Sequence, residues 1–221
     1  MLLTLTLLAA LLGQGTPPAQ ATPADTMRLV RGFANQQYAW GTMRLRKGEQ
    51  VRAYLPVAGT VADVMIPYYL QSPDSGPKVK PKFTAIANVQ WLRVRGQYFE
   101  VLSSGKREEG RLAARMQSGA VDLFAARFVP PPILTALGPN PVLSAPVDAS
   151  HPGPDAASMS WYLRRPNGPP VLVSPANFAT QVATFLADDR ELARRVAASE
   201  AGYRLAELES IIQQYNQRAR R

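Results

Sequence analysis

Short runs in which apolar and polar residues alternate fill the region that follows residue 39. Two of these runs, residues 40–45 and 51–55, are separated by a polar turn that contains Gly48. Because successive side chains of a strand point to opposite faces, this pattern predicts a β-hairpin. The residues expected to face a core are Met43, Leu45, Val51, Ala53 and Leu55. The residues expected on the other face are Trp40, Arg44, Arg46, Arg52 and Tyr54.

The same kind of pattern continues to residue 128. Residues 89–94 and 98–102 flank Arg95-Gly96-Gln97, and this arrangement predicts a second hairpin. The side chains expected to be buried in it are Leu92, Val94, Phe99 and Val101. The neighbouring segments are interpreted as an edge strand at 64–70, a polar loop at 71–82, a helix or a strand at 108–116, and a strand at 120–128.

The last third of the chain contains a Pro-rich segment, a predicted hairpin and a helical end. Residues 130–158 are rich in Pro, Gly, Ala and Ser, a composition that predicts a long loop. Residues 161–163 and 171–173 flank the turn dipeptide Asn167-Gly168, which predicts a further hairpin. The rest has helical spacing of apolar residues: a helix over 177–186, a second one that begins with Asp188 as its cap, and a third after Gly202.

Strands followed by helices indicate an α+β fold, a mostly antiparallel β-sheet of hairpins followed by two or three C-terminal α-helices. The expected organisation is a signal peptide at 1–21, a linker at 22–38, a β-rich domain at 39–129, a Pro-rich loop at 130–158, a β-hairpin returning to the sheet at 159–173, and a helical segment at 174–221.

The first residues have the composition of an export signal. Residues 2–12 are an apolar run that is too short to span a bilayer, and Ala19-Gln20-Ala21 follows two prolines as a small-x-small triplet. We expect cleavage after Ala21 and a periplasmic or extracellular protein that has no transmembrane segment after cleavage. The segment lacks the usual Lys or Arg before its apolar run, and a buried N-terminal helix is the alternative.

The chain is basic, with a formal net charge of +9, and the charge is unevenly distributed. Residues 22–130 contain 16 Lys and Arg against 8 Asp and Glu, whereas residues 131–221 contain 9 against 8. Such a field favours anionic partners, here an envelope polymer or lipid head groups, and nucleic acid is not expected outside the cytoplasm. A second possible partner is a protein that binds the C-terminal helices. The competing interpretation is that the basic charge has no function.

No motif of known chemistry is present. The sequence has no Cys and a single His, His151, inside the Pro-rich segment, so neither a metal site nor a cofactor is expected. Hydrolysis of an envelope polymer by two carboxylates that folding brings together, such as Glu100 and Asp122, is the alternative to a binding function.

The most suggestive cluster follows from the alternation in the two hairpins. If Leu92 and Val94 point inward, Trp91, Arg93 and Arg95 share the outer face. An aromatic ring beside guanidinium groups can stack on a ligand ring and contact its anionic groups. The candidate binding residues are therefore Arg44, Arg46, Arg52, Trp91, Arg93 and Arg95. The simpler alternative is a strand whose Arg stems only cover the sheet.

The C-terminal third resembles a family of exported proteins of Gram-negative bacteria. The resemblance is carried by the hairpin residues 161–168 and 171–173, by Asn177-Phe178, by residues 185–189, and by Gly202-Tyr203 and Tyr215-Asn216 near the end. It implies a signal peptide, a β-rich region and short C-terminal helices, with no established activity. From the two-to-one basic excess before residue 131, we expect a non-enzymatic envelope module that binds or scaffolds through a basic sheet face.

Overall fold

A computed structural model gives the structure, which describes residues 28–57, 64–76, 79–103, 110–127 and 159–219. The expected signal peptide and the whole Pro-rich segment, which includes His151, lie outside the described residues. The strands before the Pro-rich segment are β1 (Val30–Arg31), β2 (Gln37–Leu45), β3 (Gln50–Pro56), β4 (Met65–Tyr68), β5 (Lys82–Ala85), β6 (Val89–Val94), β7 (Gln97–Leu102), β8 (Arg111–Gln117) and β9 (Asp122–Arg127). After it come β10 (Met159–Arg164), β11 (Val171–Val173), α2 (Phe178–Phe185), α3 (Arg190–Ala197) and α4 (Leu208–Arg218).

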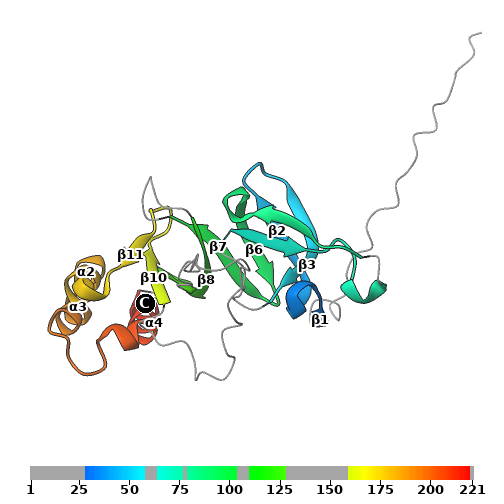
Figure 1. Cartoon of the computed structure of the whole chain (residues 1–221). Coiled ribbons are helices and arrows are strands. Elements are labelled where there is room, and N and C mark those ends of the chain that lie inside the picture. The colour runs from blue at the N-terminus through cyan, green and yellow to red at the C-terminus, as the bar shows by residue number, and fades with distance from the viewer. Residues whose placement is uncertain (1–27, 58–63, 77–78, 104–109, 128–158, 220–221) are drawn as a thin grey trace, which may run out of the picture.

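The main sheet has nine strands, and every pair in it is antiparallel. Its order is β1-β2-β6-β7-β8-β9-β10-β11, with β3 on the other side of β2, so the strands from β6 onward follow chain order. Figure 1 shows this sheet running across the molecule, with the three helices gathered at the end formed by β10 and β11. The predicted fold class, an antiparallel sheet of hairpins followed by helices, is confirmed.

The first hairpin joins β2 and β3 in the register that the alternation predicts. Met43 lies opposite Val51, and Gly41 lies opposite Ala53. Met43, Ala53 and Leu55 are fully buried, as expected, while Leu45 is half-buried. Gly41 is required here because a Cβ at this position would lie 2.5 Å from the backbone oxygen of Arg93 on β6.

The second hairpin, β6 and β7, turns through Arg95 and Gly96 alone. Their φ angles are +49° and +76°, the two positive values of a type I′ turn, whose twist matches that of the flanking strands. Val94 therefore lies opposite Gln97, and Leu92 lies opposite Phe99.

One continuous row of side chains connects the two larger hydrophobic clusters on one face of the sheet. The cross-strand partners in this row are Val51, Met43, Leu92, Phe99, Ala114, Ala125, Trp161 and Val173. At one end, Ile66 of β4 and Ile86 cover this face, and at the other end α2, α3 and α4 cover it. The opposite face carries the arginines discussed below and a smaller buried cluster, which consists of Leu102, Ala113, Phe124, Ala126 and Tyr162.

Two segments differ from the sequence-based interpretation. Part of the expected linker 22–38 forms β1, which pairs with the start of β2, and a 3-10 turn, η1 (Phe33–Asn35). The expected loop 71–82 contains η2 (Pro73–Ser75) and leads into β5, which pairs with β4 in a separate two-stranded sheet. Strands this short carry too few residues to show alternation, and long-range pairing decides them.

The helix after Asp188 has a different cap from the one predicted. Asp189 is the N-cap of α3, because its side chain accepts a hydrogen bond from the backbone N–H of Leu192 at 3.0 Å. Asp188 instead accepts hydrogen bonds from Tyr215 at 2.6 Å and from Arg165 at 2.9 Å. Both of its partners are distant in sequence, which is why local spacing did not reveal its role.

Candidate functional site

Four of the six predicted site residues share the sheet face opposite the row that contains Met43 and Leu92. Arg52 on β3 and Arg93 on β6 both lie opposite Thr42 of β2, and in the next row Arg44 lies opposite Trp91. Arg44, Arg52 and Arg93 are exposed, and Trp91 is half-buried. Since hydrogen-bonded strands are about 4.8 Å apart, Arg52 and Arg93 stand roughly 10 Å from each other across β2.

The structure adds two residues to this face that the sequence did not single out. Tyr98 of β7 lies opposite Arg93, and its ring centroid is 6.0 Å from that of Trp91. The guanidinium carbon of Arg115 lies 4.4 Å from the centroid of the Tyr98 ring. We refer to Arg44, Arg52, Trp91, Arg93, Tyr98 and Arg115 together as the Arg–aromatic face. Residue 115 fell in a segment whose secondary structure was ambiguous, so only strand pairing could place it.

The other two predicted residues are positioned differently. Arg95 is exposed at the tip of the β6–β7 turn, beside the Arg–aromatic face rather than on it. The pairing of β2 with β6 shifts register between Arg44 and Leu45. Arg46, just past this shift, donates from Nε to the carbonyl oxygen of Ala87 at 2.8 Å. Arg46 lies in the turn that follows β2, where strand alternation no longer determines the direction of a side chain.

Four exposed arginines of the β2–β3 and β6–β7 hairpins form no ion pair in the part of the chain that the structure describes. No ion pair there involves Arg44, Arg52, Arg93 or Arg95. By contrast, the C-terminal elements contain five arginines that each pair with a carboxylate, namely Arg164, Arg165, Arg194, Arg195 and Arg218. The positive field of the protein is therefore concentrated on the Arg–aromatic face.

Glu100 is the acidic residue next to this face, opposite Trp91, and it is already paired. Arg164 donates to its two carboxylate oxygens at 2.6 and 3.0 Å, and the Tyr98 hydroxyl donates to it at 3.1 Å. Burial, together with the negative charge of Glu100, raises the pKa of Tyr98 to about 12. The phenol therefore stays protonated at neutral pH and continues to donate to Glu100.

The two carboxylates proposed for hydrolysis do meet, but around a guanidinium. Arg164 also approaches Asp122 at 3.5 Å, and its guanidinium carbon lies 4.7 Å from the centroid of the Phe124 ring. Hydrogen bonding to Glu100 raises the pKa of Arg164, so a permanent cation occupies the space between the acids. A water or sugar placed between two catalytic carboxylates would need that space. The geometry is that of an ion-pair network.

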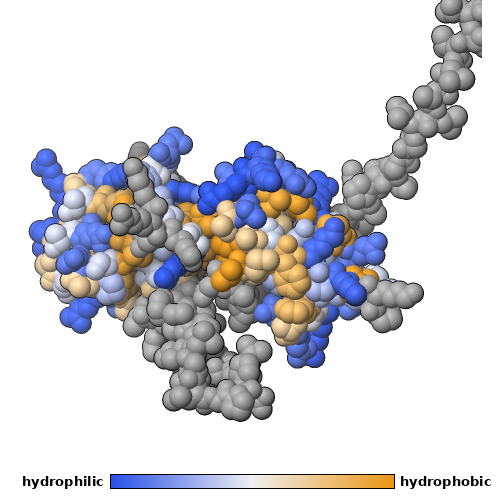
Figure 2. Space-filling model, turned by 45° about the horizontal axis from the view of Figure 1, so that its top comes forward, coloured by the Kyte–Doolittle hydropathy of each residue, from blue (hydrophilic) through white to orange (hydrophobic). Residues whose placement is uncertain are grey.

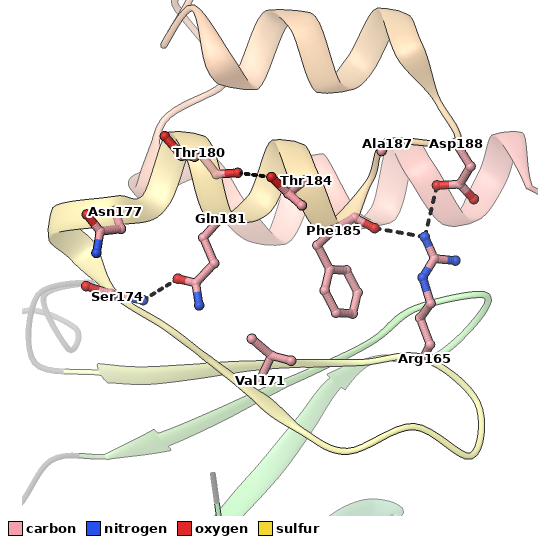
Figure 3. A pocket seen from close by; sticks show the side chains of 10 residues that line it. All are labelled: Arg165, Val171, Ser174, Asn177, Thr180, Gln181, Thr184, Phe185, Ala187 and Asp188. Atoms are coloured by element: carbon pink, nitrogen blue, oxygen red, sulfur yellow. Dashed lines mark hydrogen bonds and ion pairs between the residues drawn. The ribbon is translucent and has the colours of Figure 1, made fainter. Parts of the chain in front are cut away.

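A groove of about 1000 Å³ lies between α2 and the β10–β11 hairpin. Figure 3 shows the Phe185 ring and the Gln181 side chain reaching from α2 toward the strands, with Arg165 and Asp188 at one end. Gln181 accepts from the backbone N–H of Ser174 at 2.9 Å and donates to the carbonyl of Leu172 at 2.7 Å. The hydrogen bond from Tyr215 is the main cause that holds the pKa of Asp188 below its usual value. These contacts fasten the helix to the hairpin.

Neither a metal cluster nor a spanning helix occurs among the described residues. No group of three or more His, Cys, Asp or Glu side chains there could hold a metal ion. No helix in the described ranges is long and apolar enough to cross a membrane.

No family model, no curated protein and no solved structure matches this chain. The resemblance to exported proteins of Gram-negative bacteria therefore stays an expectation, and the functional argument depends on the geometry of the site.

Proposed function

We propose that this protein is a non-enzymatic binding module of the bacterial envelope, and that its Arg–aromatic face holds an anionic polymer. The observation that carries the proposal is the cross-strand register, which sets the unpaired Arg44, Arg52 and Arg93 beside Trp91 and Tyr98. Arginine side chains bind carboxylate, sulfate and phosphate groups through paired N–H donors. Aromatic rings beside them offer apolar surface to the backbone of a polymer.

A polymer fits this face better than a lipid surface does. The face lies on hydrogen-bonded strands, so its cations have fixed spacings that can match repeating charges. The most exposed large apolar side chains, which a bilayer would take up, lie mainly on other elements, among them Phe33 on η1 and Phe83 on β5.

The test compares two triple charge reversals that give the protein the same net charge. Arg44→Glu, Arg52→Glu and Arg93→Glu change the face, whereas Arg190→Glu, Arg194→Glu and Arg204→Glu change exposed positions on or after α3. Both sets weaken non-specific attraction equally, because it depends on net charge alone. We expect the first set to abolish retention on immobilised anionic polysaccharide, because it also removes the binding arginines. We expect the second set to reduce retention by less than about threefold. Retention of the unmodified protein should fall steeply with salt.

Equal losses from the two sets would show that the charge acts generically, and the proposal would then be wrong. Unchanged retention in both would lead to the same conclusion. DNA and heparin-like columns run in parallel establish whether the face distinguishes one polyanion from another.

Export is the second part of the proposal, and the composition of residues 1–21 supports it. Expressed with its own N-terminus in a Gram-negative host, the chain should be recovered from the periplasm or the medium, with Thr22 as its first residue by intact mass. Replacing Leu7 and Leu8 with Arg should keep it in the cytoplasm at full length, because charges interrupt the apolar run. A cytoplasmic, uncleaved wild-type protein would contradict this part of the proposal.

A further inference from the structure

A second surface, distinct from the Arg–aromatic face, presents aromatic side chains to solvent. Phe33 on η1 and Phe83 on β5 are 48% and 46% exposed, and their rings meet edge to face at 5.3 Å. In the β4–β5 register, Pro67 lies opposite Phe83 and Met65 lies opposite Ala85, so Met65, which is 38% exposed, shares a face of this ribbon with Phe83. We call Phe33, Met65 and Phe83 the apolar tip. Figure 2 shows hydrophobic side chains at the surface of the half of the molecule that carries the N-terminal strands, next to strongly hydrophilic ones.

The turn that carries Phe33 is fixed in an uncommon conformation. Ala34 and Asn35 have φ angles of +54° and +59°, and the left-handed region disfavours a residue such as alanine. The Tyr69 hydroxyl accepts a hydrogen bond from the backbone N–H of Phe33 at 2.7 Å. Gly32 lies so close to the Tyr38 and Tyr69 rings that a Cβ would approach them to 2.8–2.9 Å. These contacts hold the backbone of the turn in a conformation that exposes the Phe33 ring to solvent. Backbone strain of this kind, here the positive φ angles of Ala34 and Asn35, is often associated with function.

The charges around the tip are mostly positive. Three exposed cations lie close in sequence to the two phenylalanines. Arg31 is two residues before Phe33, and Lys80 and Lys82 are three residues and one residue before Phe83. The carboxylate among the described residues of this region, Asp74, is paired with Arg28 at 3.4 Å. Aromatic side chains surrounded by Lys and Arg complement the interface of a membrane with anionic lipids, where rings enter the boundary of the acyl chains and cations meet the head groups.

We propose that the apolar tip docks this protein on the surface of a membrane that contains anionic lipids, with Phe33 and Phe83 inserted and Arg31, Lys80 and Lys82 against the head groups. A membrane with anionic lipids fits because exposed aromatic rings are here accompanied by exposed Arg and Lys side chains that are close to them in sequence. The surface is separate from the polymer-binding face, so the two proposals stand or fall independently.

The experiment is co-sedimentation of the protein, as purified after expression with its own N-terminus, with vesicles of phosphatidylcholine and with vesicles that also contain phosphatidylglycerol. We expect binding to the anionic vesicles. The double variant Phe33→Ser and Phe83→Ser should lower the partition coefficient by roughly tenfold or more, since burial of even one Phe contributes that factor. Lys80→Glu with Lys82→Glu should remove most of the salt-sensitive part of the binding.

Met116→Ser is the matched control, because Met116 is 39% exposed on β8, away from the tip, and its loss should leave the partition unchanged. Thermal unfolding of each variant establishes that it is folded. The two triple charge reversals described above serve as a second control. Reversal of Arg44, Arg52 and Arg93 should affect vesicle binding no more than reversal of the set on or after α3.

Three results would overturn the proposal: no binding of the wild-type protein to anionic vesicles, equal binding by the Phe33→Ser and Phe83→Ser variant, or a wild-type dimer in solution that this variant converts to a monomer. The last result would mean that a second copy of the chain covers the tip.

Discussion

Replacing Asn216 by leucine is expected to destabilise the protein by about 3 kcal/mol, because two buried backbone groups lose their partners. Asn216 is buried in α4, and its amide nitrogen donates to the carbonyl oxygen of Val121 at 2.8 Å. The side-chain oxygen of Asn216 accepts a hydrogen bond from the backbone N–H of Val121 at 2.9 Å. The single side chain thus continues the hydrogen bonding of the sheet at the entrance to β9 and fixes α4 to it. Leucine has similar volume but no polar atoms.

Denaturant unfolding measures the effect, and a decrease in melting temperature on the order of 10 °C should accompany it. Gln217→Leu is the control, because Gln217 is exposed on the same helix and its replacement should change stability by less than about 0.5 kcal/mol. Gly119→Ala tests the same contact from the other side, since its Cβ would lie 2.5–2.9 Å from the side-chain atoms of Asn216. If Asn216→Leu were as mild as Gln217→Leu, α4 would not be held in this way.

Replacing Arg164 by methionine is expected to lower the free energy of unfolding by about 2–3 kcal/mol at neutral pH. The change leaves Glu100 and Asp122 facing each other with side chains that are only 19% exposed, without the cation between them. Because the folded variant brings two carboxylates together, it binds protons more readily than the unfolded chain. The loss of stability relative to the wild-type protein should therefore be smaller at pH 4 than at pH 7, because protonation removes the repulsion.

Unfolding in denaturant at pH 7 and at pH 4 checks both the size and the sign of the effect. Arg194→Met is the matched control, because Arg194 pairs with Glu200 on the surface with a side chain that is 64% exposed, and exposed pairs contribute little. A loss of the same size at both pH values would show that Arg164 acts through its packing on Phe124 alone. Polymer retention should also weaken in this variant, because it frees the charge of Glu100 beside Trp91.

The site residues show which features local sequence pattern can predict and which depend on strand pairing. Alternation placed Arg44, Arg52, Trp91 and Arg93 on one face, because strand periodicity is a property of the backbone that neighbours do not change. It could not foresee that Arg44 would lie opposite Trp91, since register between β2 and β6 depends on packing of Met43 against Leu92. Arg46 lies in the turn just past β2, so strand alternation does not determine where its side chain points.

Sequence alone determined the α+β class, the hairpins, the helical end of the chain and the concentration of positive charge before residue 131, since each follows from local periodicity, turn chemistry or composition. The tertiary structure decided what depends on groups far apart in sequence. It paired Arg164 with Glu100 and Asp188 with Tyr215, and among the described residues it left Arg44, Arg52 and Arg93 without ion pairs. It also brought Phe33 to Phe83 at the apolar tip. These contacts arise from the energy of the whole fold, so no local pattern could specify them.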